Sequence, residues 1–552
     1  MTSETEQAAP AASTSRWAAA LLLAAMVLAS VAVIHQSRGT LAWFDEWDFI
    51  IGRRGLAANV LLDAHNGHLV VAPLLLYKLL LSVAGITHHW VFSAALLALH
   101  LLVGGGVFVF AKRRIGELGA AVAAGFVLFC FAASDDLIWT FQISFLMSVA
   151  FGVWMLVALD RDDRGGDLVA SLCLAGALAS AAIGIPFVIA AAVVVGSDER
   201  RWKRAWVVLI PVVLFAAWYL VYGVSDAQPS NLPQLPLFVA ELGSSAVGGL
   251  TGLGIAYGRP LLLVLGAAVI YRLAAPRGSL KWLIALVLAA LGLWALTALT
   301  RIGITPPTTP RYIYPGAVLV VLVVAELCRG HRLSTRAAPV AIALLLAAGL
   351  SNYALLGSFA SGQRDVADNL RASLGALTLV DGVAPEFRPA PRTNPQISAG
   401  GASVAQRDFG TIALDADRLQ GGSPVQREVA DSVLIRAGQV GISRAVRLGG
   451  ETPRVLAVRS ARVGRAGACL AIRPRAPGAA VDVALAPGRS LIAQSAYSVP
   501  VYLRRFAAGF PPQPSFTLPS GSASRISAAA DAVGADWAVR LQPGALLRLC
   551  QR

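Results

Sequence analysis

The chain from residue 17 to residue 34 reads WAAALLLAAMVLASVAVI, an unbroken apolar run. A helix rises about 1.5 Å per residue, so this run is long enough to cross about 30 Å of hydrocarbon. A cleaved signal peptide has a shorter apolar core and a small-residue cleavage site. Because an acidic loop and further apolar runs follow, we expect a retained membrane span, preceded by a cytoplasmic tail over residues 1–16.

The composition of the whole chain agrees with this first span. Of 552 residues, 56% are hydrophobic and only 14% are charged, whereas about one quarter of a soluble globular chain is charged. A soluble enzyme, a disordered scaffold and a fibrous rod are thereby excluded. The net charge of +15 does not indicate nucleic-acid binding: 23 arginines against 13 acidic residues follow Gly357, and most of the remaining excess lies in short loops, where basic residues set membrane topology.

Apolar runs recur as far as residue 356 and predict a polytopic α-helical membrane protein. Basic clusters such as Lys112–Arg114 mark the cytoplasmic side, which requires the short run Leu69–Ala84 to lie at the outer interface without crossing. About eleven crossings of the plasma membrane are then expected, with the N-terminus in the cytoplasm and the C-terminus outside. The expected spans are 17–34, 90–111, 118–133, 141–159, 168–183, 187–195, 205–222, 260–273, 282–299, 314–327 and 337–356, and a long outer loop with one interfacial helix is expected over 226–258.

The tail after residue 357 has a different pattern. A helix and a linker rich in Pro, Gly and Ala are expected over 358–400, and short alternating runs such as Val481–Leu485 follow between glycine-rich turns. These runs predict an extracytoplasmic, mostly-β domain over 401–552. Cys469 and Cys550 are the two cysteines of the tail. In an oxidising exterior we expect them to form a disulfide, with two free buried thiols as the alternative.

The outer loop after the first span carries a dense cluster of acidic residues. Asp45, Glu46 and Asp48 stand there among Trp and Phe side chains. Carboxylates are costly beside lipid and usually mark function in a membrane protein, although a solvated loop anchored by interfacial aromatics has the same pattern. The segment His65–His68 (sequence HNGH) follows. It fits a phosphate or metal site, the wall of an acceptor pocket, or ordinary interfacial histidines.

This layout resembles that of the GT-C glycosyltransferases, the polytopic class that takes sugars from polyprenyl-phosphate carriers. In that class an acidic motif follows the first span, as Asp45-Glu46 does here, and interfacial helices come next, one often opening with a Pro- and Tyr-containing segment such as Pro73–Lys78. A late outer loop of the class ends in an Arg-Tyr pair before the next span, which Arg311-Tyr312 matches. The resemblance covers the arrangement of residues 17–357.

The resemblance implies an inverting enzyme that moves a sugar from a polyprenyl-phosphate donor to a cell-envelope glycan or glycolipid outside the cytoplasm. Such transfer needs a base for the acceptor hydroxyl and positive charge for the phosphate leaving group. Asp45 is the expected base, with Glu46 as the alternative. The other expected roles are acceptor binding by Asp48, His65, Asn66, His68, Trp139 and Gln142, phosphate binding by Arg301, Arg311 and Tyr312, and a divalent cation, Mg²⁺ or Ca²⁺, held by Asp135 and Asp136.

Two other functions fit the same sequence. A transporter or flippase for a lipid-linked glycan would line a path with these charged groups, but such proteins usually show internal repeats and charges near the membrane midplane, and neither is visible in the sequence. A non-catalytic protein whose Arg-rich tail binds envelope polymer would leave Asp45, Glu46 and Arg311 dispensable. The expected partners are the lipid-linked sugar, the envelope acceptor and membrane lipids, and not nucleic acid.

Overall fold

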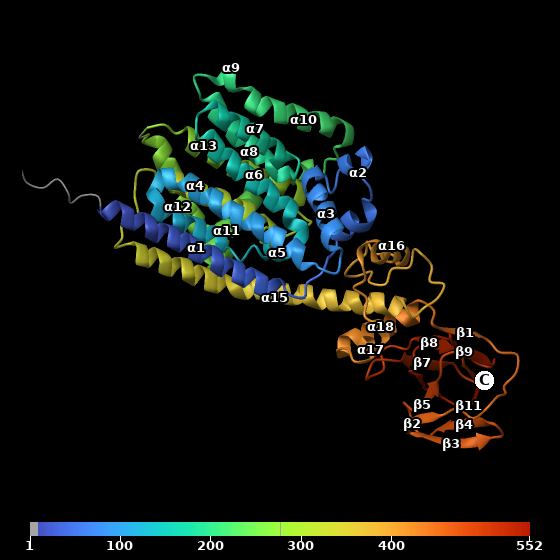
Figure 1. Cartoon of the computed structure of the whole chain (residues 1–552). Helices are drawn as coiled ribbons and strands as arrows, with labels where there is room; N and C mark the ends of the chain where they lie inside the picture. Colours follow the sequence, from blue (N-terminus) through green and yellow to red (C-terminus); the bar gives the residue numbers. More distant parts are fainter. Residues whose placement is uncertain (1–8, 277) are drawn as a thin grey trace, which may run out of the picture. The chain divides into compact units, whose positions relative to one another are not determined.

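A computed structural model describes residues 9–276 and 278–552, and the chain divides into two compact units, Met1–Arg364 and Asp365–Arg552. Residues 1–8 of the expected cytoplasmic tail 1–16 lie outside the described residues, as does Arg277. The first unit is helical, and the second carries the β-sheets (Figure 1). The helix α15 (Ala338–Leu377) begins in the first unit and ends in the second.

Seven helices among the described residues are long and apolar enough to cross a membrane. A chain in lipid must satisfy its backbone hydrogen bonds internally, which is why these apolar runs become helices. They are α1 (Ala9–Ser37), α4 (Trp90–Leu128), α6 (Ile143–Leu159), α12 (Gly254–Ala274), α13 (Lys281–Arg301), α14 (Pro310–Leu327) and α15; the turn η2 (Thr140–Gln142) directly precedes α6.

The helix α4 consists of two arms folded back on each other at Gly116, which has φ +76°. Gly104 and Leu128 are equally far along the sequence from Gly116, and a Cβ on Gly104 would lie 2.7 Å from the Leu128 side chain. The two arms are therefore antiparallel. The arms correspond to the expected spans 90–111 and 118–133. The other three expected spans correspond to shorter helices, α7 (Arg164–Leu178), α8 (Ile185–Gly196) and α10 (Trp206–Tyr222). The total of eleven crossings and the orientation of both termini stay predictions.

The stretch 226–258, expected as a long outer loop with one interfacial helix, contains more helix than that, and its position outside the membrane stays a prediction. Most of this stretch is helical, in η4 (Pro229–Gln234), α11 (Leu235–Thr251) and the first turn of α12. A Cβ on Gly248 or Gly258 would collide with the backbone of the facing helix. Glycines that resemble a loop signal in the sequence therefore allow two helices to pack closely, as small residues often do in membrane proteins.

Six short helices and helical turns complete the described part of the first unit, one of them the turn η3 (Ala182–Gly184). Among them, α3 (Val71–Ala84) has 14 residues, too few to cross a bilayer, in keeping with the interfacial helix expected at 69–84. The others that matter for the site are α5 (Ser134–Ile138) and the π-turn η1 (Asp48–Gly52), with α2 (Ala58–Leu62) and α9 (Arg201–Arg204) elsewhere.

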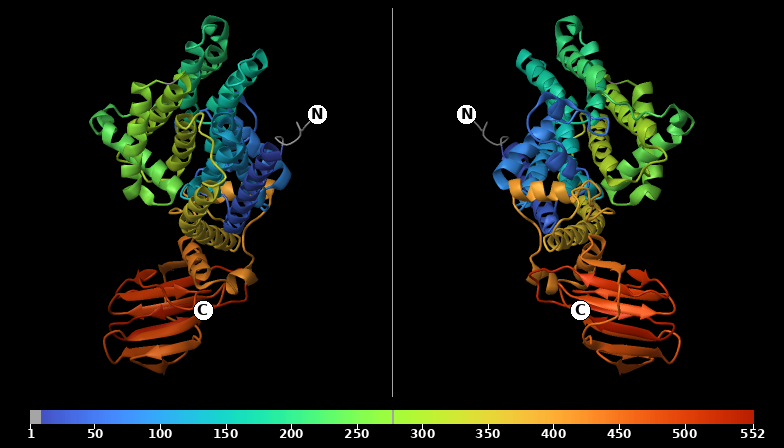
Figure 2. Two further views of the ribbon diagram at one scale, coloured as in Figure 1. Left: turned by 90° about the vertical axis from the view of Figure 1, so that its left-hand side faces the viewer. Right: turned by 90° about the vertical axis from the view of Figure 1, so that its right-hand side faces the viewer.

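The second unit is a sandwich of two antiparallel sheets, drawn in orange to red in Figure 2. One sheet has the order β1-β9-β6-β11-β4-β3 and the other β2-β5-β10-β7-β8. The strands are β1 (Val440–Arg444), β2 (Val455–Arg459), β3 (Ala461–Ala466), β4 (Cys469–Pro474), β5 (Ala480–Leu485), β6 (Ser490–Ser495), β7 (Val499–Arg504), β8 (Phe516–Leu518), β9 (Ser524–Ala528), β10 (Trp537–Leu541) and β11 (Leu547–Gln551).

The sandwich core also includes helical residues. Ala372 and Ala376, near the end of α15, are buried with Trp537 and the inward side chains of both sheets. Three helices, α16 (Ala399–Phe409), α17 (Ala416–Gln420) and α18 (Pro424–Arg436), come before the first strand. The sheets therefore begin at Val440 and not at residue 401. The sulfur atoms of Cys469 on β4 and Cys550 on β11 are bonded, across two strands that pair with each other.

Candidate active site

The acidic loop after α1 is built around the side chain of Glu46. This carboxylate is fully buried. It accepts the backbone N–H of Trp43 at 2.7 Å and the hydroxyls of Tyr77 on α3 and Thr140 on η2. These bonds tie the loop to two other elements. Glu46 thus holds the loop in place, whereas its neighbour Asp45 faces a cavity.

The side chains of Asp48 and His65 also stabilise the acidic loop. Asp48 Oδ2 accepts from Arg53 Nε at 3.2 Å and lies 3.0 Å from His65 Nδ1. Burial alone would raise the pKa of Asp48, but the hydrogen bond and charge of His65 and the charge of Arg53 outweigh it and lower that pKa. Neither residue is among those that line the two cavities described below, and their expected role in acceptor binding stays a prediction.

Asn66 and Gly67 form the corner of a two-residue turn. His65 and His68 exchange backbone hydrogen bonds of 3.0 and 2.9 Å, and the two corner residues have φ of +50° and +75°. Asn-Gly is the preferred sequence for a type I′ turn, which needs positive φ at both positions. A Cβ on Gly67 would lie 3.1 Å from the carbonyl oxygen of Val224. The turn therefore rests on the segment after α10 and brings Asn66 and His68 to the cavities.

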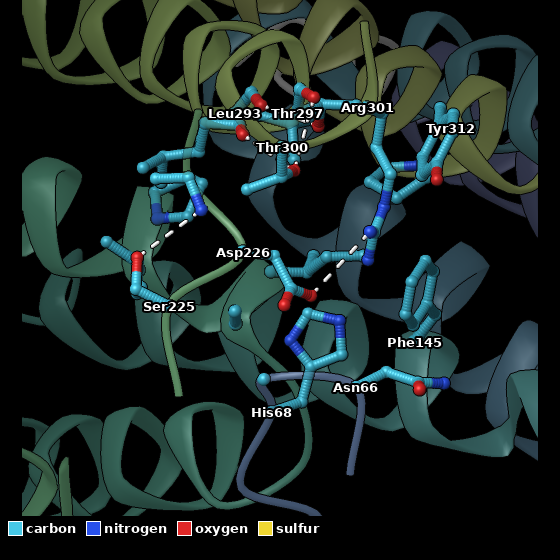
Figure 3. A pocket seen from close by; sticks show the side chains of 18 of the residues that line it. Asn66, His68, Phe145, Ser225, Asp226, Leu293, Thr297, Thr300, Arg301 and Tyr312 are labelled. Carbon is cyan, nitrogen blue, oxygen red and sulfur yellow. Dashed lines mark hydrogen bonds and ion pairs between the residues drawn. The ribbon is translucent and has the colours of Figure 1, made fainter. Parts of the chain in front are cut away.

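Two cavities adjoin at this turn. The first, shown in Figure 3, is called the apolar cavity because of the apolar side chains in its wall, several of which come from α8, α10 and α13. The second is called the polar cavity because Asp45 and Arg311 line it. The apolar wall consists of Ile183, Ile185, Pro186, Tyr219, Leu293 and Leu296, and the residues common to both cavities are Asn66, His68, Phe145, Asp226, Arg301 and Tyr312.

Aromatic rings form one side of the polar cavity. The ring centroids of Trp43 and Trp139 are 4.8 Å apart, and Trp139 stacks on Phe141 at 5.3 Å. Trp139 Nε1 also donates to the carbonyl of Trp43 at 3.2 Å, which joins η2 to the acidic loop. Gln142 lines the same cavity, and its buried Oε1 has no hydrogen-bond partner in the described part of the chain. An apolar ring surface beside an open amide suits a sugar ring.

Two arginines face carboxylates at distances longer than a hydrogen bond. Arg301 Nη1 lies 3.8 Å from Asp226 Oδ2, and Arg311 Nη1 lies 3.7 Å from Asp135 Oδ2. Each guanidinium has five N–H donors in a planar fork. Both can therefore offer donors to a phosphate, which a guanidinium binds bidentately.

The electrostatics of the cavity residues follow mainly from burial. Burial raises the pKa of Asp45, against the opposing charges of His65 and Arg311. A carboxylate with a raised pKa is a stronger proton acceptor. Burial, with the charges of Arg301 and His65, lowers the pKa of His68 to about 4. His68 is therefore neutral near pH 7, and it adds no positive charge beside Arg301.

Asp135 and Asp136 lie on α5 next to Arg311. Burial raises the pKa of Asp135 to about 6, against the charge of Arg311, and burial with the charge of Asp135 raises that of Asp136 well above its usual value. No group of three His, Cys, Asp or Glu side chains in the described residues could hold a metal ion. A cation at this pair stays a prediction, because Mg²⁺ in proteins is often held by one or two carboxylates with water and substrate phosphate as its other ligands.

One residue at the junction of the cavities was missed by sequence reasoning. Asp226 lines both cavities and faces Arg301. It is the only acidic residue of the sequence between Glu199 and Glu241. A lone carboxylate in a stretch dominated by apolar and Pro residues was the signal that could have marked it.

The fold is that of a polytopic membrane protein with a C-terminal β-sandwich. No protein-family model matches the sequence, and no curated protein matches it. Among solved structures, the chain is similar to the crystal structure of ArnT from Cupriavidus metallidurans in the apo state, over 77% of this chain and 92% of that chain, with 14% sequence identity and a TM-score of 0.43. A similarity at this level says nothing of substrates.

Proposed function

We propose that the chain is a GT-C type glycosyltransferase that moves a sugar from a polyprenyl-phosphate donor to a cell-envelope acceptor outside the cytoplasm. The observation that carries this proposal is the junction of the two cavities. The apolar cavity shares Arg301 and five other lining residues with the polar cavity, which is also lined by Asp45. A lipid-linked sugar has the same order of parts: an apolar chain, a phosphate and a sugar.

The donor would bind with its three parts in this order along the two cavities. Its prenyl chain would occupy the apolar cavity, where each buried CH₂ contributes about 0.8 kcal/mol. Its phosphate would lie at the junction, within reach of Arg301 and Arg311, with the hydroxyl of Tyr312 beside them. The sugar would then enter the polar cavity and lie against the Trp43 and Trp139 rings. The acceptor hydroxyl would approach from the side of Asp45.

In this proposal the side chains act on the transfer step as follows. Asp45 takes the proton of the acceptor hydroxyl while the hydroxyl oxygen attacks the anomeric carbon. The bond from that carbon to the phosphate oxygen breaks, and its electron pair leaves with the polyprenyl phosphate. Attack opposite the leaving group inverts the configuration. Arg301 and Arg311 stabilise the negative charge that grows on the phosphate.

The proposal is tested in a strain that lacks the gene. Its lipid-linked sugars and envelope glycans are compared with those of the parent. We expect a polyprenyl-phosphate-linked sugar to accumulate and one envelope sugar to disappear. The intact gene should restore both, and the Asp45→Ala variant should restore neither. Full restoration by Asp45→Ala would contradict the proposal and favour a transporter or a binding protein, which needs no base.

A further inference from the structure

Asp226 occupies a position where a negative charge opposes phosphate binding. It lines both cavities, and its carboxylate lies 3.8 Å from the guanidinium of Arg301. The Asp226 side chain is 39% exposed and that of Arg301 is 20% exposed, so the pair borders the cavity and is not part of the packed core. Figure 3 shows the two side chains pointing toward one another, with His68 and Phe145 beside them.

We propose that Asp226 competes with the phosphate for Arg301 and thereby promotes release of the polyprenyl-phosphate product. This inference rests on the proposed function and assigns Asp226 a role in turnover. The pair distance exceeds that of a hydrogen bond, so a phosphate can displace the carboxylate without breaking a bidentate contact. His68 is neutral and supplies no second positive charge to offset Asp226.

The two phosphates of the reaction carry different charges. The donor is a phosphodiester with one negative charge, whereas the product is a monoester whose second ionisation has a pKa of about 6, so near neutral pH it approaches two negative charges. Coulomb repulsion by Asp226 scales with the charge of the ligand. Asp226 therefore disfavours the product more than the donor, which is the selectivity that turnover requires.

The carboxylate is held where this repulsion acts. A Cβ on Gly67 would lie 3.4 Å from Asp226 Oδ2, so the Asn66-Gly67 turn lies directly against Asp226. The backbone of the segment after α10 is fixed by the same turn, at Val224. The turn therefore limits the space on the side of Asp226 that faces Gly67.

The test measures binding by the full-length protein in lipid nanodiscs near pH 8. The probes are farnesyl phosphate, a monoester, and its methyl diester. Asp226→Asn should tighten binding of the monoester by about two- to fivefold, the size expected for a partly exposed charge pair, and tighten binding of the diester less. Asp63→Asn is the matched control, because Asp63 is an exposed acid of the outer loop that lines neither cavity. Asp226→Ser provides a second variant should Asp226→Asn fold poorly.

The outcomes separate this inference from the proposed function. Equal affinities of wild type and Asp226→Asn for the monoester, or equal tightening of both probes, would overturn the role of Asp226. Failure of the wild-type protein to bind either probe would instead count against the proposed function. Arg301→Gln should weaken binding of both probes, and this result would show that the phosphate lies where the inference requires it.

Discussion

At the residue scale, the site gives two adjacent carboxylates different environments. Asp45 borders the polar cavity and is near Arg311, whereas Glu46 is enclosed and accepts hydrogen bonds from Tyr77 and Thr140. A proton acceptor must reach its substrate, and a structural anchor must have its hydrogen bonds satisfied. These environments support the proposal that Asp45 is the base and that Glu46 positions the loop.

Asp45→Ala should lower the transfer rate by about 10²- to 10⁴-fold, the usual contribution of a general base, and leave the melting temperature of the purified protein unchanged.

Glu46→Ala should lower the free energy of unfolding by about 1–3 kcal/mol, because the buried hydroxyls of Tyr77 and Thr140 lose their acceptor. Initial rates and thermal unfolding in detergent check both. An Asp45→Ala protein as active as the wild type, or an active Glu46→Ala protein of unchanged stability, would contradict the assignment.

The pH dependence of the rate should follow the buried carboxylates. Asp45 accepts a proton only when ionised, and its pKa is raised, so kcat/KM should rise with pH and level off above that pKa. Asp135, with a pKa of about 6, must also be ionised to pair with Arg311. Profiles between about pH 4 and pH 8 should therefore lose part of their acid limb in Asp135→Asn. A flat wild-type profile, or a rate that falls as pH rises, would contradict this account.

The sequence could mark the acidic motif as functional but could not rank its members. Asp45 and Glu46 are both acids in one loop, and what separates them comes from elsewhere in the chain. Tyr77 is 31 residues and Thr140 is 94 residues from Glu46. Burial of a side chain by such distant partners cannot be seen in a local pattern. The same reason explains why the sequence could not show that Asp48 pairs with His65 and Arg53.

At the scale of elements, the Asn66-Gly67 turn is the smallest unit that shapes both cavities. Gly67→Ala should slow transfer, because the added Cβ would press on Val224 and displace His68. The matched control is Gly55→Ala: Gly55 also has positive φ, +80°, but an added Cβ there would meet nothing within 4 Å. Both substitutions incur the strain of positive φ, roughly 1–2 kcal/mol. Activity and thermal stability are measured for each, and equal activity losses would show that strain alone is responsible.

Helices were predicted well where an apolar run was long and poorly where glycine decided the geometry. Expected spans such as 17–34 and 282–299 lie within α1 and α13. At Gly116 a glycine ends one arm and starts the next, whereas at Gly248 and Gly258 glycines lie inside helices that touch. The residue type is the same in both cases. Only the neighbouring helix, which the sequence does not show, separates a turn from a close contact.

At the scale of the whole molecule, a disulfide bond links two strands of the β-sandwich. The bond between Cys469 and Cys550 closes a loop with a sequence separation of 81 residues, for which chain entropy predicts about 3–4.5 kcal/mol of stabilisation. The double variant Cys469→Ser and Cys550→Ser should lose about that much stability in the second unit. Denaturant unfolding followed by the fluorescence of Trp537, with and without a reductant, checks this. No effect of reductant on the wild-type protein would contradict the disulfide.

The site itself is a property of the whole first unit. Its cavity residues come from the acidic loop, the turn at residues 65–68, η2, the segment after α10, and the ends of α13 and α14. Sequence reasoning marked Asp45 as a candidate from its acidic cluster, and Arg301 and Arg311 from their places beside a late Pro-rich loop. Their meeting at one cavity depends on the packing of the helices, which no single segment encodes. Asp226 was missed for this reason, since its role appears only beside Arg301.

The most direct test of the central claim follows the bond that the reaction breaks. Purified protein in liposomes is incubated with the sugar-labelled lipid fraction from the deletion strain and with envelope acceptor from the same strain. The account predicts that label moves from lipid to acceptor while polyprenyl monophosphate appears in equal amount, and that Asp45→Ala does neither. Label that stays on the lipid, with no monophosphate released by the wild-type protein, would contradict the account.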